Sequence, residues 1–287
     1  MDNCIDGLHG YIFISLIIIT FALLIIHKRP NLTMSLSPYV TTTVADSVAT
    51  IEFYHPSHNS LPSHILASIV TEIESNDRNS DVEVVVLKSG GDRTFCAGAS
   101  FDEMLAINDK ESGQSFFMGF ANVINACRKC SKLIIGRVQG KAIGGGVGLA
   151  SAVDYCIASK YASVKLSELA VGIGPFVVGP AVERKTGLSA MSHLAINATE
   201  FMTAQWAKEK GLFNEVFDTV EQVDAYVKHL SQILVNQSKE AKAELKSVLW
   251  SGTENWDQLL RDRAEISGRL ILTEDAKNAM AKFKTKA

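Results

Sequence analysis

Three consecutive glycines, Gly144 to Gly146, stand where an apolar, helix-like run begins. Adjacent glycines weaken a helix that contains them, so their position at its start needs a reason. A helix start offers free N–H groups and the positive end of the helix dipole, which suit an oxygen atom that carries negative charge. The glycines therefore indicate that such an oxygen approaches the backbone closely. A flexible turn is the alternative that they leave open.

Two other patterns have residue types that catalysis or metal binding uses, but each lacks a required part. Cys127 and Cys130 have C-x-x-C spacing without a second pair, so we expect no metal site. The segment Gly98–Asp102, GASFD, imitates the start of the G-x-S-x-G turn that carries a nucleophilic serine. Asp102 occupies the place of the last glycine, so a hydrolase that uses Ser100 with a downstream histidine is the weaker alternative.

The composition is that of a globular protein with a large core. The 287 residues are 47% hydrophobic and 21% charged, with a formal net charge of −3. This near-neutral balance, without a basic cluster, argues against nucleic acid as a partner. The five cysteines are odd in number and scattered, which favours a reduced cytoplasmic compartment over a disulfide framework.

The first 33 residues differ from the rest of the chain. Tyr11–Ile26 is an uncharged apolar stretch, at or just under the length that crosses a bilayer, and His27–Arg29 follows it directly. The positive-inside rule would keep everything after such an anchor in the cytoplasm. A domain could equally begin at Met34, with the upstream part a mis-called start. We therefore separate residues 1–33, as a membrane anchor or mis-called start, from the body.

The body alternates short strands with helices from about Val44 onward. Two strands and a helix recur every forty to fifty residues, roughly, which predicts an α/β spiral of strand–strand–helix units over residues 34–221. After Gln222 the pattern is helical only, so residues 222–287 are predicted to form a C-terminal helical region. The clearest strands are expected at Ser47–His55, Val82–Gly91, Lys132–Gly140, Asp154–Ser159, Ser163–Glu168 and Gly211–Phe217.

Three segments of this body resemble the crotonase superfamily, also called the enoyl-CoA hydratase/isomerase family. They are Thr94–Met104, Val138–Ser159 and Leu166–Ile173, and the resemblance extends from about Thr41 to the C-terminus. It implies a crotonase-like spiral core with a C-terminal helical region, homotrimers or hexamers of paired trimers, and acyl-CoA thioesters as substrates. Coenzyme A would then be part of the substrate, and no separate cofactor is expected.

The resemblance also implies a role for individual residues. The N–H groups of Ala99 and Gly145 match the family's oxyanion hole, and Glu168 matches its catalytic carboxylate. Limited water around Glu168 would raise its pKa toward the range useful for proton transfer. The resemblance places the substrate against Ala99, Ser100, Phe101, Asp102, Gly145 and Phe176.

The sequence departs from the family pattern where a second carboxylate would stand. Hydratases usually have a glutamate three residues beyond the oxyanion glycine, where this chain has Gly148. Dienoyl isomerases have a carboxylate eight residues past the first, where this chain has Phe176. Moving a double bond needs only one carboxylate, so we favour double-bond isomerisation of enoyl-CoA. A hydratase that uses Glu168 alone and a low-turnover acyl-CoA-binding protein are the alternatives.

Overall fold

A six-stranded sheet forms the centre of the computed structural model, which describes residues 37–284. Its first two strands pair antiparallel and all later neighbours pair in parallel. The central strands VVVLKS and LIIGRV are almost wholly buried, because helices cover both faces of a parallel sheet. Across the sheet the order is β1 (Tyr39–Ala45), β2 (Val48–Tyr54), β4 (Val84–Ser89), β7 (Leu133–Val138), β9 (Tyr155–Ser159) and β12 (Glu215–Phe217).

The second strand of each repeat leaves this sheet and joins a smaller one. The units β7–β8–α5 and β9–β10–α6 both follow this path, which confirms the predicted spiral of strand–strand–helix repeats. The smaller sheet has the order β11 (Met202–Thr203), β10 (Ser163–Lys165), β8 (Lys141–Ile143) and β5 (Thr94–Cys96). A two-stranded pair is formed by β3 (Ser60–Leu61) and β6 (Gly98–Ala99).

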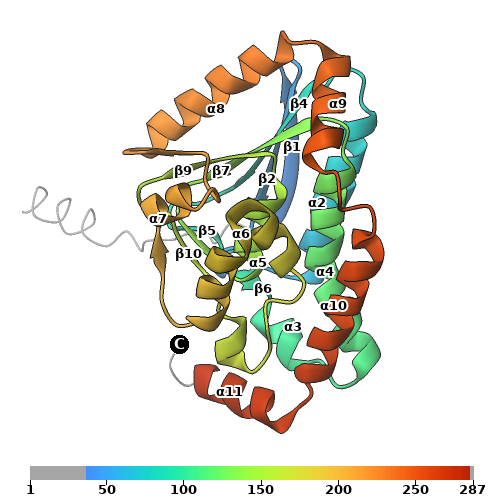
Figure 1. The fold of residues 1–287 in the computed structure, drawn as a ribbon, viewed down its shortest axis with the longest axis vertical. Helices are drawn as coiled ribbons and strands as arrows, with labels where there is room; N and C mark the ends of the chain where they lie inside the picture. The colour runs from blue at the N-terminus through green and yellow to red at the C-terminus, as the bar shows by residue number, and fades with distance from the viewer. Residues whose placement is uncertain (1–36, 285–287) are drawn as a thin grey trace, which may run out of the picture. The chain divides into compact units, whose positions relative to one another are not determined.

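Helices enclose the sheets and continue to the C-terminus, as predicted. Figure 1 shows α2, α4 and α10 side by side along one flank, while α8 packs across strands of the large sheet. The helices of the core are α2 (Ser63–Arg78), α3 (Phe101–Leu105), α4 (Lys110–Lys129), α5 (Gly145–Ala152), the 3₁₀ helix η1 (Glu168–Val171), α6 (Gly179–Ile196) and α7 (Ala204–Glu209). After β12 come α8 (Val220–Val235), α9 (Lys239–Leu249), α10 (Trp256–Leu270) and α11 (Glu274–Lys284).

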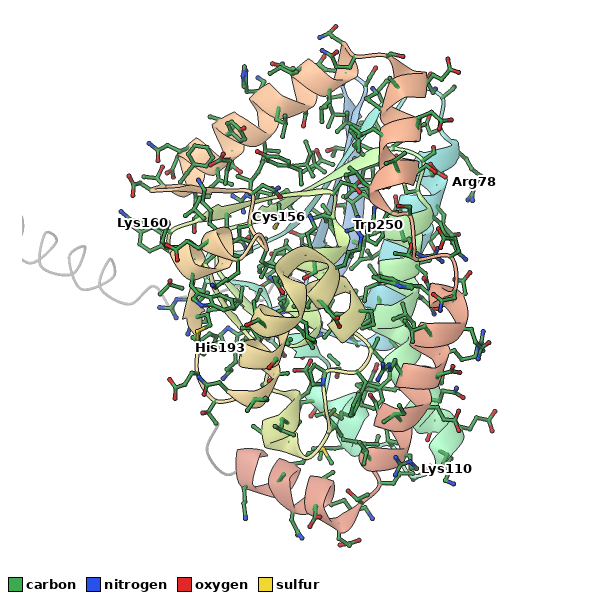
Figure 2. All side chains as sticks on the ribbon, viewed as in Figure 1. Arg78, Lys110, Cys156, Lys160, His193 and Trp250 are labelled. Carbon is green, nitrogen blue, oxygen red and sulfur yellow. The ribbon has the colours of Figure 1, made fainter. Side chains whose placement is uncertain are left out.

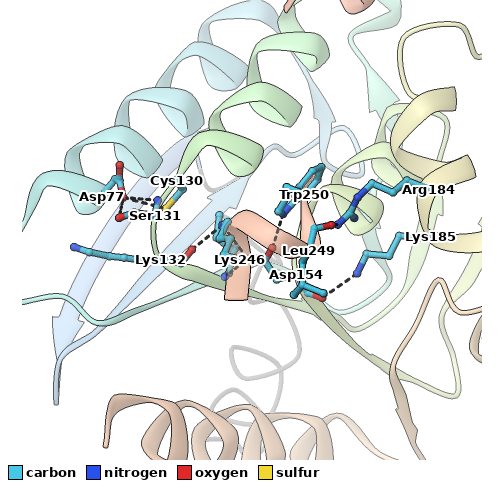
Figure 3. A network of polar contacts seen from close by, with 11 residues as sticks. Asp77, Cys130, Ser131, Lys132, Asp154, Arg184, Lys185, Lys246, Leu249 and Trp250 are labelled. Carbon is cyan, nitrogen blue, oxygen red and sulfur yellow. Dashed lines mark hydrogen bonds and ion pairs between the residues drawn. The ribbon is translucent and has the colours of Figure 1, made fainter. Parts of the chain in front are cut away.

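A buried polar network joins α9 to the sheet core (Figure 3). The Asp154 carboxylate accepts hydrogen bonds from Ile134 N and from Trp250 Nε1, each at 2.7 Å. It also forms an ion pair with Lys246 at 2.9 Å, and both side chains are at most 5% exposed. Lys246 Nζ donates a further bond to Lys132 O at 2.7 Å. Asp154 is thus the point at which β7, α9 and the loop before β9 are held together.

The structure differs from the sequence prediction in local detail. Strand β1 was not predicted, since its side chains are largely exposed and show little apolar alternation. The strand predicted over Ser163–Glu168 ends at Lys165, and Glu168 instead begins η1. No helix among residues 37–284 combines the length and the apolar character that a membrane crossing requires. The segment Tyr11–Ile26 lies outside the described residues.

Candidate active site

The three glycines form the turn from β8 into α5, and each sits against another part of the fold. Gly144 is the N-cap residue, with φ +53°, and its N–H donates to Lys165 O at 2.8 Å. Gly145 is the first residue of α5, so its N–H has no partner within the helix. A Cβ at Gly145 would collide with the ring of Phe120, and one at Gly146 with Cys96 O. Protein groups thus pack closely against these glycines, and the approach of a negatively charged oxygen stays a prediction.

Strand β6 brings Ala99 beside this helix start. A Cβ built on Gly98 would lie 3.6 Å from Gly145 N and 3.2 Å from Ile143 O. The neighbouring Ser100 N–H donates to Leu61 O at 3.0 Å, which fixes β6 against β3. The structure therefore brings Ala99 and Gly145, predicted from separate motifs, to the wall of one cavity.

Glu168 lies at the first position of η1 and faces the same cavity. Its Oε2 is buried and has no hydrogen-bond partner within the described chain, while Oε1 lies near Gly144. Burial raises the pKa of Glu168 to about 7, although its own backbone N–H acts in the opposite direction. A carboxyl group that is half ionised near neutral pH, with one oxygen free of protein partners, is suited to both accept and donate a proton.

The cavity has a volume of 710 Å³ and is lined mainly by apolar side chains. Its wall is formed by one face of α4, by the segment that joins η1 to α6, and by the loops around β3 and β6. Phe101, Asp102 and Phe176, which are predicted to bind the substrate, are among its lining residues. The sequence analysis did not identify the further lining residues Met104, Phe116, Phe117, Phe120, Val171, Ile173, Val177, Val178 and Ser267.

Ser100 lies outside this lining, unlike the other predicted substrate-binding positions. Its hydroxyl caps α3 by accepting a hydrogen bond from Glu103 N at 3.3 Å. Downstream, His193 contacts Met202 Sδ at 3.3 Å and packs on Trp206, on the part of α6 marked in Figure 2. Within residues 37–284, no hydrogen bond joins Ser100 to a histidine, so the geometry gives no support to the hydrolase alternative.

Glu103 joins α3 to the start of α2 through two hydrogen bonds. Its Oε2 accepts hydrogen bonds from Ser63 N at 2.9 Å and from Ser63 Oγ at 2.7 Å. Ser63 is the first residue of α2, and Pro62 is its N-cap. These hydrogen bonds connect residues forty positions apart, and they hold the short segment that carries Ala99–Asp102 in place.

The fold leaves no room for a second catalytic carboxylate at position 148, and position 176 has an aromatic side chain instead. A Cβ at Gly148 would lie 2.5 Å from Val178 Cγ1, and Phe176 presents a ring to the cavity. Among the described residues, Glu168 and the exposed Asp102 are the carboxylates that line the cavity. The enclosed part of the site therefore has Glu168 as its acid.

The C-x-x-C cysteines lie away from the cavity, between α4 and β7. Burial raises the pKa of Cys127 to about 12 and that of Cys130 to about 11. Cys130 Sγ also lies 3.6 Å from Asp77 Oδ1, a contact that favours the protonated thiol (Figure 3). Metal binding and disulfide chemistry need the thiolate, which this environment disfavours.

Comparison with known proteins gives the same assignment as the geometry. A curated peroxisomal Delta(3,5)-Delta(2,4)-dienoyl-CoA isomerase from Arabidopsis thaliana is 28% identical over 243 residues, covering 79% of this chain and 86% of the relative. A short-chain-enoyl-CoA hydratase from Clostridium acetobutylicum is 29% identical over 226 residues, covering 78% and 86%. The relatives thus include both an isomerase and a hydratase.

A crystal structure of an enoyl-CoA hydratase from Bacillus halodurans has the same fold, with a TM-score of 0.79 at 19% identity. The match covers 85% of this chain and 99% of that one. A family model described as enoyl-CoA hydratase/isomerase matches residues 43–287, which is most of the chain and includes every site residue discussed above. The chain therefore belongs to the enoyl-CoA hydratase/isomerase family.

Proposed function

We propose that this protein moves the double bond of a 3-enoyl-CoA to the 2-position. Glu168 takes a proton from C2 of the substrate, the negative charge spreads over a dienolate, and Glu168 returns the proton at C4. No atom is gained or lost. The observation that carries this proposal is the Glu168 carboxyl group in a largely apolar cavity, with its Oε2 buried and without a hydrogen-bond partner and with a pKa of about 7.

The dienolate oxygen would accept hydrogen bonds from Ala99 N and Gly145 N. Gly145 is suited to this role because it opens α5, where the helix dipole adds positive potential. Donors aimed at a developing oxyanion contribute more to the transition state than to the ground state, and one donor typically contributes about 3–4 kcal/mol. Coenzyme A enters this scheme as part of the substrate, and the chemistry requires no further cofactor.

Hydration is the second candidate, because a curated hydratase is among the relatives. It would use Glu168 to activate water and would need a second proton donor for efficient turnover. The contact between Gly148 and Val178 leaves no room for a second glutamate on α5, which supports isomerisation over hydration. A protein that binds acyl-CoA with little turnover would not need the raised pKa of Glu168.

A panel of 2-enoyl- and 3-enoyl-CoA thioesters in deuterated water distinguishes these functions. We expect 3-enoyl-CoA to give a 2-enoyl product that has not gained water, as measured by mass spectrometry, with deuterium at C4 wherever Glu168 exchanges its proton with the solvent before returning it. A hydroxylated product from 2-enoyl-CoA at a comparable rate would replace isomerisation with hydration. Tight binding of every thioester without exchange would identify a binding protein.

The activity should depend on pH through Glu168. The reaction begins with the ionised carboxylate, and the pKa of Glu168 is about 7. We expect kcat/KM for the isomerisation to rise about tenfold per pH unit below 7 and to level off above it. A pH–rate profile in buffers of constant ionic strength measures this. A flat profile between about pH 5 and 8 would show that Glu168 does not begin the reaction as a base.

We also propose that the protein assembles as a homotrimer or as a pair of trimers, as the family resemblance implies. Leu188 and Ile196 on α6 and Val248 on α9 are each more than 60% exposed, and such apolar side chains are suited to an interface. The four cysteines within residues 37–284 are free thiols, which is in keeping with the expected cytoplasmic compartment. Light scattering on the purified chain measures the assembly.

A further inference from the structure

The inner part of the cavity is an apolar chamber, which we define by Met104, Phe116, Phe117, Val171 and Ile173. Phe117 and Met104 pack with Val171 and Ile173 in one hydrophobic cluster, which Met280 of α11 completes from outside. The chamber thus lies between α3, α4 and η1. Phe120, one turn further along α4, is the residue whose ring covers Gly145. On α4, Phe116 and Phe117 of the chamber thus lie about one helical turn from the residue that covers Gly145.

Another part of the cavity lining is polar and exposed to solvent. Ser57 and His58 line it and are exposed, as is Asp102. A coenzyme A moiety carries several phosphate charges and must remain at this exposed part. The thioester then lies at Ala99 and Gly145, and the acyl chain continues into the chamber.

The chamber offers no partner for a charged group on the acyl chain. Ser267 is the buried polar residue on its wall, and its hydroxyl already donates to Arg263 O at 3.2 Å. Lys165 also lines the cavity, but its ammonium lies 4.3 Å from the centre of the Phe201 ring, and Phe201 is not part of the lining. Of the other ionisable lining residues, His58 and Asp102 are exposed, and Glu168 would repel a carboxylate.

We propose that this site selects unsubstituted hydrocarbon acyl groups long enough to enter the chamber, octanoyl over butanoyl, and rejects acyl groups that end in a carboxylate. The inference rests on the proposed function only in taking an acyl-CoA as the ligand. Each methylene that enters the chamber leaves water, which tightens binding by up to about fourfold. A terminal carboxylate would be desolvated without a counter-ion, which is far more costly than the gain from its methylenes.

Saturated thioesters test this without turnover. We would measure dissociation constants by calorimetry for butanoyl-CoA, octanoyl-CoA and the monothioester of octanedioic acid with coenzyme A. Octanoyl-CoA should bind at least about tenfold more tightly than butanoyl-CoA. The octanedioyl thioester should bind about 100-fold more weakly than octanoyl-CoA at pH 8. That penalty should shrink at pH 5, where the terminal carboxyl group begins to protonate.

A charge placed in the chamber provides the matched variant. Met104→Lys adds an ammonium at a half-buried position, and Met104→Gln is the neutral control. The lysine variant should reduce the penalty for the octanedioyl thioester at least about tenfold relative to the glutamine variant. If both variants fail to fold, the wild-type comparison still decides the question.

Each outcome separates this inference from the proposed function. Equal binding of octanoyl-CoA and the octanedioyl thioester, or tightest binding of butanoyl-CoA, would overturn the selectivity even if isomerisation is observed. The expected binding order without any double-bond movement would leave the selectivity in place and remove the isomerase function. A lysine variant that folds but does not favour the octanedioyl thioester over the glutamine control would show that the acyl terminus does not reach the chamber.

Discussion

Replacing Glu168 with glutamine should lower kcat for double-bond movement by about 10³- to 10⁴-fold, because a positioned acid–base group contributes about that much. The amide keeps the size of the side chain but can neither accept nor return the proton. Binding of a saturated acyl-CoA should change by less than about threefold, since in the proposed mechanism the carboxylate acts on the reacting carbons and not on the coenzyme A. Single-turnover kinetics and calorimetry measure the two quantities separately.

The same variant should be more stable than the wild type above neutral pH. The pKa of Glu168 is raised from 4.5 to about 7, so the folded state holds its proton more tightly than the unfolded state. Its destabilising contribution is absent below pH 4.5, grows as the pH rises and is complete above 7. We expect Glu168→Gln to raise the free energy of unfolding by about 1–3 kcal/mol at pH 8. Activity is then lost while the fold is retained.

Glu183→Gln is the control for this experiment. Glu183 is an exposed glutamate on α6, outside the cavity, so its replacement should leave both kcat and stability unchanged. A loss of less than tenfold on replacing Glu168 would show that another group transfers the proton. A loss of binding as large as the loss of kcat would show that the substitution damaged the site as a whole.

Replacing Lys246 with alanine should reduce the free energy of unfolding by about 3–5 kcal/mol. Its ammonium is 3% exposed and pairs with Asp154, which is 5% exposed, so the substitution leaves a carboxylate buried without its counter-ion. It also removes the donor to Lys132 O. Urea unfolding measures the loss, and it should affect the whole domain because Asp154 joins β7 and α9.

The exposed pair Lys160–Asp218 provides the comparison. Its side chains are 49% and 75% exposed at a distance of 3.2 Å, and Figure 2 shows Lys160 at the surface. Lys160→Ala should cost less than about 1 kcal/mol. Combining Lys246→Met with Asp154→Asn removes both buried charges. This double variant should recover part of the free energy of unfolding that Lys246→Ala loses. Equal effects at the two pairs would refute the special role of burial.

The sequence was informative where a residue's role depends on its local chain. The glycines at 144–146 and the glutamate at 168 lie in short motifs, and the glycines stand at a helix start as expected, whereas Glu168 begins η1 beyond the end of β10. The alternation of strands and helices predicted the spiral for a similar reason, since periodicity is a local property. These features did not require knowledge of which elements pack together.

The rest of the site depends on packing between distant elements. Phe120 covers Gly145 only because α4 and α5 meet at one particular orientation, and the amphipathic pattern of α4 does not specify which apolar residue faces a cavity. The bond from Ser63 to Glu103 spans forty residues and has no sequence signature. Ser100 was assigned to the substrate with its neighbours, yet its hydroxyl turns toward α3.

The contact of Gly148 with Val178 limits how this protein could change during evolution. A glutamate at position 148 would meet the Val178 side chain at the first carbon beyond the backbone. Such a mutation is therefore harmful unless position 178 has already become smaller, and a smaller residue there brings no benefit of its own. The two changes are epistatic. A directed-evolution experiment toward two-carboxylate chemistry should accept the smaller residue at position 178 before the glutamate at position 148, or both changes together.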